Sequence, residues 1–123
     1  MREIIFDFGD FLIQGILNDS PTSNIFYGLL PISGESQIWG EEIYFSTQIK
    51  VQNDEWAKET VELGDIAFWP PGNALCLFFG PTPISAPNEI RPASATNIMG
   101  KLKGDLELLK NVKSSDSIIV RHK

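Results

Sequence analysis

Short apolar runs of strand length, separated by turn-forming residues, fill most of this sequence and restrict its fold more than any other feature. Residues 2–8 and 11–17 are rich in Ile and Phe, and Gly9-Asp10 between them is typical of a two-residue hairpin turn. Residues 74–79 form an unbroken apolar run, which predicts a strand buried on both faces. About eight such runs, many of them joined by hairpins, predict a mainly β protein with a closed antiparallel barrel.

The other expected strands are also bounded by turn residues. Two hairpins are expected among them, one around Gly40 and one around Gly64-Asp65. Pro70-Pro71-Gly72-Asn73 predicts a turn, because two prolines fix φ and remove hydrogen-bond donors. These other strands comprise residues 37–39, 42–47 with an extension at 49–52, 61–63, 66–69, 96–102 and 117–121.

Two short helices are expected between the strands. Ser20 can cap the first helix, and Pro21 suits its first position, where a missing N–H costs nothing. Asp105 is expected to cap the second. The residues expected to face the core are Ile25, Phe26, Leu29 and Leu30 from the first helix and Leu106, Leu109 and Val112 from the second.

Residues 80–95 are predicted to be a long loop, because four prolines prevent a regular strand there. Long loops within a compact domain often carry function.

Composition excludes several classes of protein. A chain of 123 residues predicts one domain, residues 1–123. One Cys and one His, His122, exclude an internal disulfide and argue against a catalytic triad or a metal centre, so we expect no metal or cofactor. The net charge of −6 argues against nucleic acid as a partner. With neither a secretory signal nor a membrane-length apolar run, we expect a cytoplasmic protein without a membrane partner.

Several segments resemble cyclophilins in sequence and in order. Residues 21–30 (PTSNIFYGLL), 76–79 (CLFF) and 98–102 (IMGKL) are similar to cyclophilin segments. Residues 39–45 (WGEEIYF), 64–83 (GDIAFWPPGNALCLFFGPTP) and 91–94 (RPAS) resemble small prokaryotic cyclophilin-like proteins that have no established function. The resemblance is colinear over nearly the whole chain, and it implies an eight-stranded barrel plugged by two helices.

The same resemblance raises the question of prolyl isomerisation. This reaction needs an apolar pocket for the proline ring and a donor near its nitrogen, which weakens amide resonance. Cyclophilins take this donor from an arginine on the strand after the first helix, whereas residues 36–42 here hold no arginine and two acids, Glu41 and Glu42. A carboxylate accepts hydrogen bonds and cannot replace that donor. The remaining basic candidate is Arg91, in the long loop.

A ligand cleft is nevertheless expected from the aromatic residues. Phe79 matches the aromatic beneath the proline ring in cyclophilins, although aromatics on strands also serve as core residues. Only one of Glu41 and Glu42 can enter the barrel mouth, since successive strand residues face opposite ways. A buried Glu42 would need a partner, for which Arg91 or Tyr44 is expected, and Cys76 is expected to be a buried, inert thiol. The candidate ligand-binding residues are Trp39, Glu42, Tyr44, Phe45, Trp69, Phe78, Phe79 and Arg91.

We therefore expect a binding module for a small molecule or an extended peptide, including a peptide that contains proline. No catalytic residue can be assigned. One alternative is a weak peptidyl-prolyl isomerase that uses Arg91 or backbone donors. A second is an accessory role in small amide or carboxylate metabolism, by analogy with larger enzymes that carry such domains. A homodimer is a further alternative.

Overall fold

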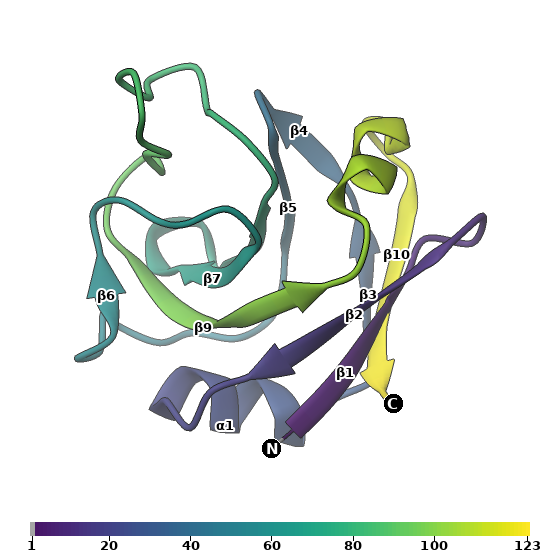
Figure 1. Cartoon of the computed structure of the whole chain (residues 1–123). Coiled ribbons are helices and arrows are strands. Elements are labelled where there is room, and N and C mark those ends of the chain that lie inside the picture. Colours follow the sequence, from purple (N-terminus) through teal and green to yellow (C-terminus); the bar gives the residue numbers. More distant parts are fainter. Residues whose placement is uncertain (1) are drawn as a thin grey trace.

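Within residues 2–123, ten antiparallel strands form one sheet, which curls into a nearly closed barrel (Figure 1). The computed structural model describes residues 2–123. Nine strands follow one another in the order β3-β10-β1-β2-β9-β7-β8-β5-β4, and β6 pairs with β9. The prediction of eight strands is therefore corrected to ten in the described residues. The prediction of a closed barrel is also corrected, because β3 and β4, at the two ends of this order, do not pair with each other. The strands are β1 (Arg2–Asp7), β2 (Leu12–Leu17), β3 (Ile32–Glu35), β4 (Gln37–Trp39), β5 (Glu42–Ser46), β6 (Ala57–Lys58), β7 (Asp65–Trp69), β8 (Ala74–Phe78), β9 (Thr96–Lys103) and β10 (Ser117–His122).

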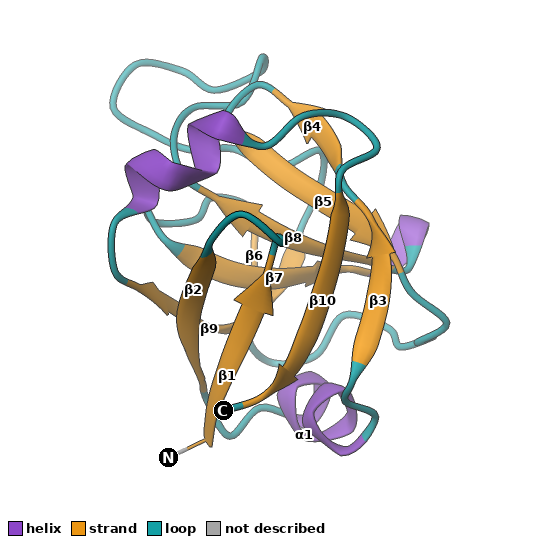
Figure 2. Cartoon of the chain, turned by 90° about the vertical axis from the view of Figure 1, so that its right-hand side faces the viewer, coloured by secondary structure: helices purple, strands orange, loops and turns teal. Residues whose placement is uncertain are grey.

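The two expected helices are present and lie near opposite ends of the barrel (Figure 2). In α1 (Pro21–Gly28) the Ser20 hydroxyl accepts a hydrogen bond from the backbone of Ser23, and in the 3₁₀ helix η2 (Leu106–Asn111) the Asp105 carboxylate accepts one from Glu107. These caps satisfy N–H groups that have no partner within the helix. No helix among residues 2–123 is both long enough and apolar enough to cross a membrane.

The expected apolar face of the first helix is partly wrong. Phe26 and Leu30 are buried, but Ile25 and Leu29 are 44% and 55% exposed. Leu30 follows the end of α1, so the helical spacing used for the prediction does not extend to it.

Two of the three hairpins predicted from the sequence are present in the structure, and the third is not. β1 pairs with β2, and β4 pairs with β5 around Gly40. Residues 61–63 form no strand, and Val61 makes only an isolated bridge with Ile90 in the long loop. β7 instead pairs with β8 across the short 3₁₀ helix η1 (Pro70–Gly72). Residues 49–52 do not extend β5, while β3 and β6 were not expected.

Strand alternation separates an interior core from a second apolar layer on the outer side of the sheet. Ile43 and Phe45 of β5 belong to the interior core. Cys76 and Phe78 of β8 belong to the outer layer, although both are almost fully buried. This matches the prediction that the apolar run of β8 is buried on both faces.

The long loop after β8 covers the outer layer, and the β4–β5 turn helps to fix it. Gly40 has a φ of +61°, and a Cβ atom there would lie 2.8 Å from Pro83 Cδ. The backbone N–H of Glu41 donates to the Pro81 carbonyl at 2.9 Å. At the far side of the loop, the Val61 N–H donates to the Ile90 carbonyl at 2.9 Å.

Candidate functional site

A cavity of about 180 Å³ lies between the outer face of the sheet and the long loop. The loop is the arch at the upper left of Figure 1. Two tryptophans, a tyrosine and a glutamate account for half of the residues that line the cavity. The lining residues are Trp39, Glu42, Tyr44, Trp69, Cys76, Pro92, Ala93 and Thr96.

The pairing register of β4, β5 and β8 places the strand residues of the cavity next to one another. Trp39 on β4 lies opposite Glu42 on β5, and Tyr44 lies opposite Cys76 on β8. Glu42 and Tyr44 are two positions apart on one strand, so they share a face. Trp69, at the end of β7, completes the strand side of the cavity, while Pro92 and Ala93 of the loop stand across from it.

Glu42 is the acidic residue of this cavity, and it is only 6% exposed. Its Oε1 atom is buried and has no hydrogen-bond partner among the described residues. Burial raises the pKa of Glu42 to about 7, and the neighbouring Cys76 thiol partly opposes the rise. Burial, together with the neighbouring Glu42 charge, raises the pKa of the Cys76 thiol well above its ordinary value. Cys76 is therefore a protonated thiol at neutral pH, as expected from the sequence.

Thr96 supplies a second unpaired polar atom to the same cavity. Thr96 is fully buried, and none of residues 2–123 provides a hydrogen-bond partner for its Oγ1 atom. Within residues 2–123, three buried side-chain atoms lack a partner: Ser36 Oγ, Glu42 Oε1 and Thr96 Oγ1. Two of the three therefore belong to residues that line one cavity. Buried polar atoms are normally hydrogen-bonded, to protein or to ordered water, so the coincidence of two unpaired atoms makes this cavity the candidate site.

Hydrogen bonds fix the loop side of the cavity. Trp69 Nε1 donates to Ser94 Oγ at 2.7 Å, which joins the end of β7 to the loop. Thr82 donates its hydroxyl to the Arg91 carbonyl, and the Arg91 N–H donates to Ser85 Oγ at 2.9 Å. The cavity wall is thus held by side-chain bonds rather than by strand pairing.

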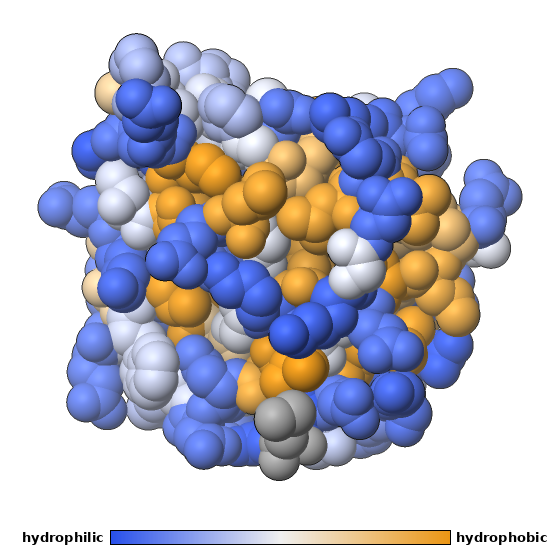
Figure 3. Space-filling model, in the orientation of Figure 1, coloured by the Kyte–Doolittle hydropathy of each residue, from blue (hydrophilic) through white to orange (hydrophobic). Residues whose placement is uncertain are grey.

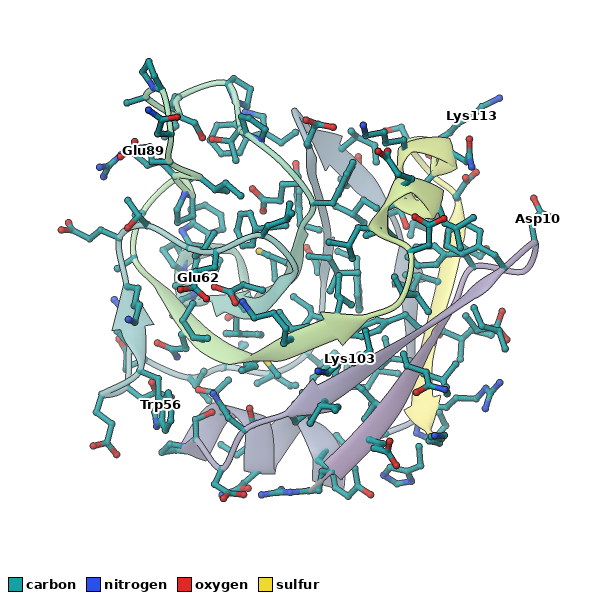
Figure 4. The ribbon with its side chains drawn as sticks, viewed as in Figure 1. Asp10, Trp56, Glu62, Glu89, Lys103 and Lys113 are labelled. Carbon is teal, nitrogen blue, oxygen red and sulfur yellow. The ribbon has the colours of Figure 1, made fainter. Side chains whose placement is uncertain are left out.

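Arg91 is turned away from the cavity by an acid of its own loop. Its Nε atom lies 2.8 Å from Glu89 Oε2, and Glu89 lies on the loop at the upper left of Figure 4. This ion pair lowers the pKa of Glu89 and raises that of Arg91. The expected Glu42–Arg91 pair is therefore corrected, since the guanidinium has a nearer carboxylate. No residue that lines the cavity is a lysine or an arginine.

The structure divides the sequence-predicted residues into two groups. Trp39, Glu42, Tyr44 and Trp69 line the cavity. Phe78 lies in the outer layer opposite Glu42 but does not line the cavity.

The other two aromatic residues predicted to bind the ligand lie in the barrel core. Phe45 and Phe79 belong to the interior cluster, at 0% and 8% exposure. Neither residue lines the cavity, which lies on the outer face of the sheet rather than at the barrel mouth, so their role as ligand contacts stays a prediction without support from this geometry. Glu41, the neighbour of Glu42, instead lies 3.9 Å from Lys110 at the surface.

Four lining residues were not predicted as ligand contacts. Cys76 could have been found from strand periodicity, because it stands two positions before Phe78 and therefore shares its face. Pro92 and Ala93 reach the cavity through the path of the loop, for which the sequence carries no periodic signal. Thr96 is the first residue of β9, and its approach to the cavity depends on how that strand meets the loop.

The rest of the surface has no second site that combines a cavity with unpaired polar atoms among the described residues. A larger hollow of about 620 Å³ beside β9 includes Glu62, Asp65 and Lys101, and Lys101 is paired with both acids, at 3.0 and 2.6 Å. In the view of Figure 3, hydrophilic residues break the hydrophobic surface into small areas. No three His, Cys, Asp or Glu side chains between residues 2 and 123 are grouped so that they could hold a metal ion.

Comparison with known proteins supports the resemblance seen in the sequence. The family model for cyclophilin-like proteins matches residues 2–121. A hypothetical protein from Archaeoglobus fulgidus, solved in solution, is 40% identical and superposes with a TM-score of 0.83, covering 99% of this chain and 95% of that one. A search of the curated proteins returned no relative. The chain therefore belongs to the cyclophilin-like family.

Proposed function

We propose that this protein is a noncatalytic binding module whose ligand enters the cavity between β5, β7, β8 and the long loop. One observation carries the proposal: aromatic walls from Trp39, Tyr44 and Trp69 surround a buried carboxyl group that has an unpaired oxygen. Concave apolar sites with a few converging polar groups are the usual form of ligand sites in proteins.

The size of the cavity favours a small ligand. Sites for drug-sized molecules measure roughly 300–1,000 Å³, whereas this one measures about 180 Å³. It accommodates a small molecule or the single anchoring side chain of an extended peptide, whose remaining residues would lie along the loop.

The charges around the cavity favour binding over prolyl isomerisation. A catalyst of that reaction needs a hydrogen-bond donor at the imide nitrogen. The cavity presents Glu42 instead, and Arg91 is held by Glu89. The hydroxyls of Tyr44 and Thr96 and the thiol of Cys76 can donate hydrogen bonds, but none of them supplies the positive charge of an arginine.

The proposal can be tested by titrating ¹⁵N-labelled protein with Xaa-Pro peptides and with a library of small metabolites. Binding should shift the indole N–H signals of Trp39 and Trp69. Trp56 provides an internal control, because it is 40% exposed and lies at the lower left of Figure 4, away from the loop. If no compound shifts the Trp39 and Trp69 signals, the binding module is rejected.

A prolyl isomerisation assay tests the noncatalytic part separately. We expect no acceleration over the uncatalysed rate. Rapid turnover would contradict the proposal, and loss of that turnover in Arg91→Ala would identify Arg91 as the donor.

A further inference from the structure

The unpaired carboxyl oxygen of Glu42 restricts the chemistry of the ligand. A buried carboxylate is costly unless a charge or a set of donors compensates it. No described residue donates a hydrogen bond to Oε1. In its ionised form a carboxyl oxygen only accepts hydrogen bonds, so a ligand that satisfies this form brings a donor, and a charged donor gives the strongest bond.

Several basic residues of the protein pair with other acids, and Lys58, which lies opposite Thr96 in the β6–β9 register, does not line the cavity. Arg91 pairs with Glu89, Lys101 pairs with Asp65 and Glu62, and Lys110 pairs with Glu107 at 2.8 Å. None of these basic residues lines the cavity. An anionic ligand would therefore meet Glu42 without any compensating positive charge.

The walls of the cavity also favour a cation. Trp39, Tyr44 and Trp69 each contribute an aromatic ring, whose face attracts positive charge. The hydrogen bond to Ser94 holds the Trp69 indole in place. The hydroxyl of Thr96 is an additional acceptor for an N–H group.

We propose that the cavity binds a small organic cation, whose ammonium or amidinium group donates to Glu42 Oε1 and lies among the rings of Trp39, Tyr44 and Trp69. This inference rests on the proposed function and specifies its ligand class. The cation is either a free molecule or the side chain of a lysine or arginine in a peptide, since both present the same chemistry.

Three probes of nearly equal shape and different charge test the inference: benzamidinium, benzamide and benzoate. We expect benzamidinium to bind at least about tenfold more tightly than benzamide, since a charge-assisted bond and desolvated cation–π contacts each exceed the value of a tenfold change. Benzoate should not bind. Shifts of Trp39 and Trp69, with Trp56 unchanged, locate the binding.

Two variants that remove the same charge separate the cavity from the surface. Glu42→Gln should reduce the preference for benzamidinium over benzamide to about twofold or less, since only a neutral acceptor remains. Glu41→Gln should keep the preference, because the Glu41 carboxylate lies at the surface near Lys110. Acetylated arginine and lysine amides, compared with short peptides that contain them, distinguish a free cation from a peptide side chain.

A pH series on the wild-type protein gives a second measurement if Glu42→Gln does not fold. Benzamidinium should bind more weakly below pH 7, where Glu42 becomes protonated. The other titratable groups that line the cavity are the Tyr44 hydroxyl and the Cys76 thiol, from β5 and β8. The raised pKa of Cys76 places its titration outside this range.

The outcomes separate this inference from the proposed function. If benzamide or benzoate binds as tightly as benzamidinium, or if Glu42→Gln keeps the charge preference, the cation inference is wrong and the binding module stands. If neither these probes nor the peptide and metabolite library shifts Trp39 and Trp69, both fail.

Discussion

The indole Nε1 of Trp69 donates a 2.7 Å hydrogen bond to Ser94 Oγ, and this bond joins the end of β7 to the loop across the cavity. Trp69 lines the cavity together with Pro92 and Ala93, which directly precede Ser94. The ring and the loop wall are therefore positioned by one contact.

Replacing Ser94 by alanine should weaken ligand binding more than it weakens the fold. The bond lies at the surface, so its loss should cost about 1 kcal/mol or less in unfolding free energy. The Kd for benzamidinium should rise several-fold as Trp69 and the loop lose their fixed positions. Ser117→Ala on β10, another exposed serine, is the matched control. Unchanged binding in Ser94→Ala would show that the bond does not position the site.

Glu42→Gln should remove a pH-dependent loss of stability. The pKa of Glu42 is raised from 4.5 to about 7, so the folded protein keeps a proton that the unfolded chain releases in this interval. The unfolding free energy of the wild type should therefore fall as the pH rises from about 4.5 to about 7.

Because glutamine stays neutral, the variant should be more stable than the wild type at pH 8, by up to about 3 kcal/mol. The two proteins should be similar near pH 4. Urea unfolding at both pH values measures the difference, and Glu41→Gln controls for the loss of one negative charge. An equal difference at both pH values would mean that the Glu42 carboxyl is not the cause.

Alanine substitutions of the neighbouring residues Phe45 and Tyr44 on β5 should differ in effect, the first acting mainly on stability and the second on ligand binding. Phe45 is fully buried in the barrel core, and Phe45→Ala should lower the unfolding free energy by about 3–5 kcal/mol. Tyr44 faces the cavity, so Tyr44→Ala should cost less stability and should weaken cation binding. Denaturant unfolding and titration of both variants test this pair. Larger destabilisation by Tyr44→Ala than by Phe45→Ala would contradict the assigned faces.

Gly40→Ala should disturb the contact between the β4–β5 turn and the long loop. The left-handed φ of +61° costs an alanine about 1–2 kcal/mol, and the new Cβ would also lie 3.0 Å from the Pro81 carbonyl oxygen. We expect a lower melting temperature and shifted signals for the loop. Gly28→Ala is the control, because the space around Gly28 is open and alanine favours the helix. Equal stability of the two variants would argue against the contact.

Much of the fold is predictable from local sequence, because turns and alternation are local properties. Gly40 between two apolar runs predicts the β4–β5 hairpin, and Ser20-Pro21 predicts the start of α1. The region around Gly64 looks equally like a hairpin, yet β7 pairs with β8 and β9. The turn residues Gly64-Asp65 do not distinguish these pairings, which depend on the other strands available to β7.

The candidate site is less predictable than the fold. The presence of Trp39, Glu42, Tyr44 and Trp69 on strands follows from the sequence, as does the placement of Glu41 and Glu42 on opposite faces. The sequence does not predict that Phe45 and Phe79 point into the core, because an aromatic residue suits either the core or a cleft. The Glu89–Arg91 pair depends on the conformation of a loop that contains four prolines and has no periodic pattern.

The sequence by itself determined the strand-rich character of the fold and its helix starts, because turn chemistry and side-chain alternation act between neighbouring residues. The family was indicated by resemblance of whole segments and is shown by the family model over residues 2–121. Only the tertiary structure decided that the cavity lies outside the barrel and that Glu42, which lines it together with Thr96, has a buried Oε1 atom that no residue among 2–123 satisfies. These features arise where the long loop meets the outer face of the sheet. Such a contact forms between segments that are distant in the sequence. Their packing also decides which polar atoms are removed from water.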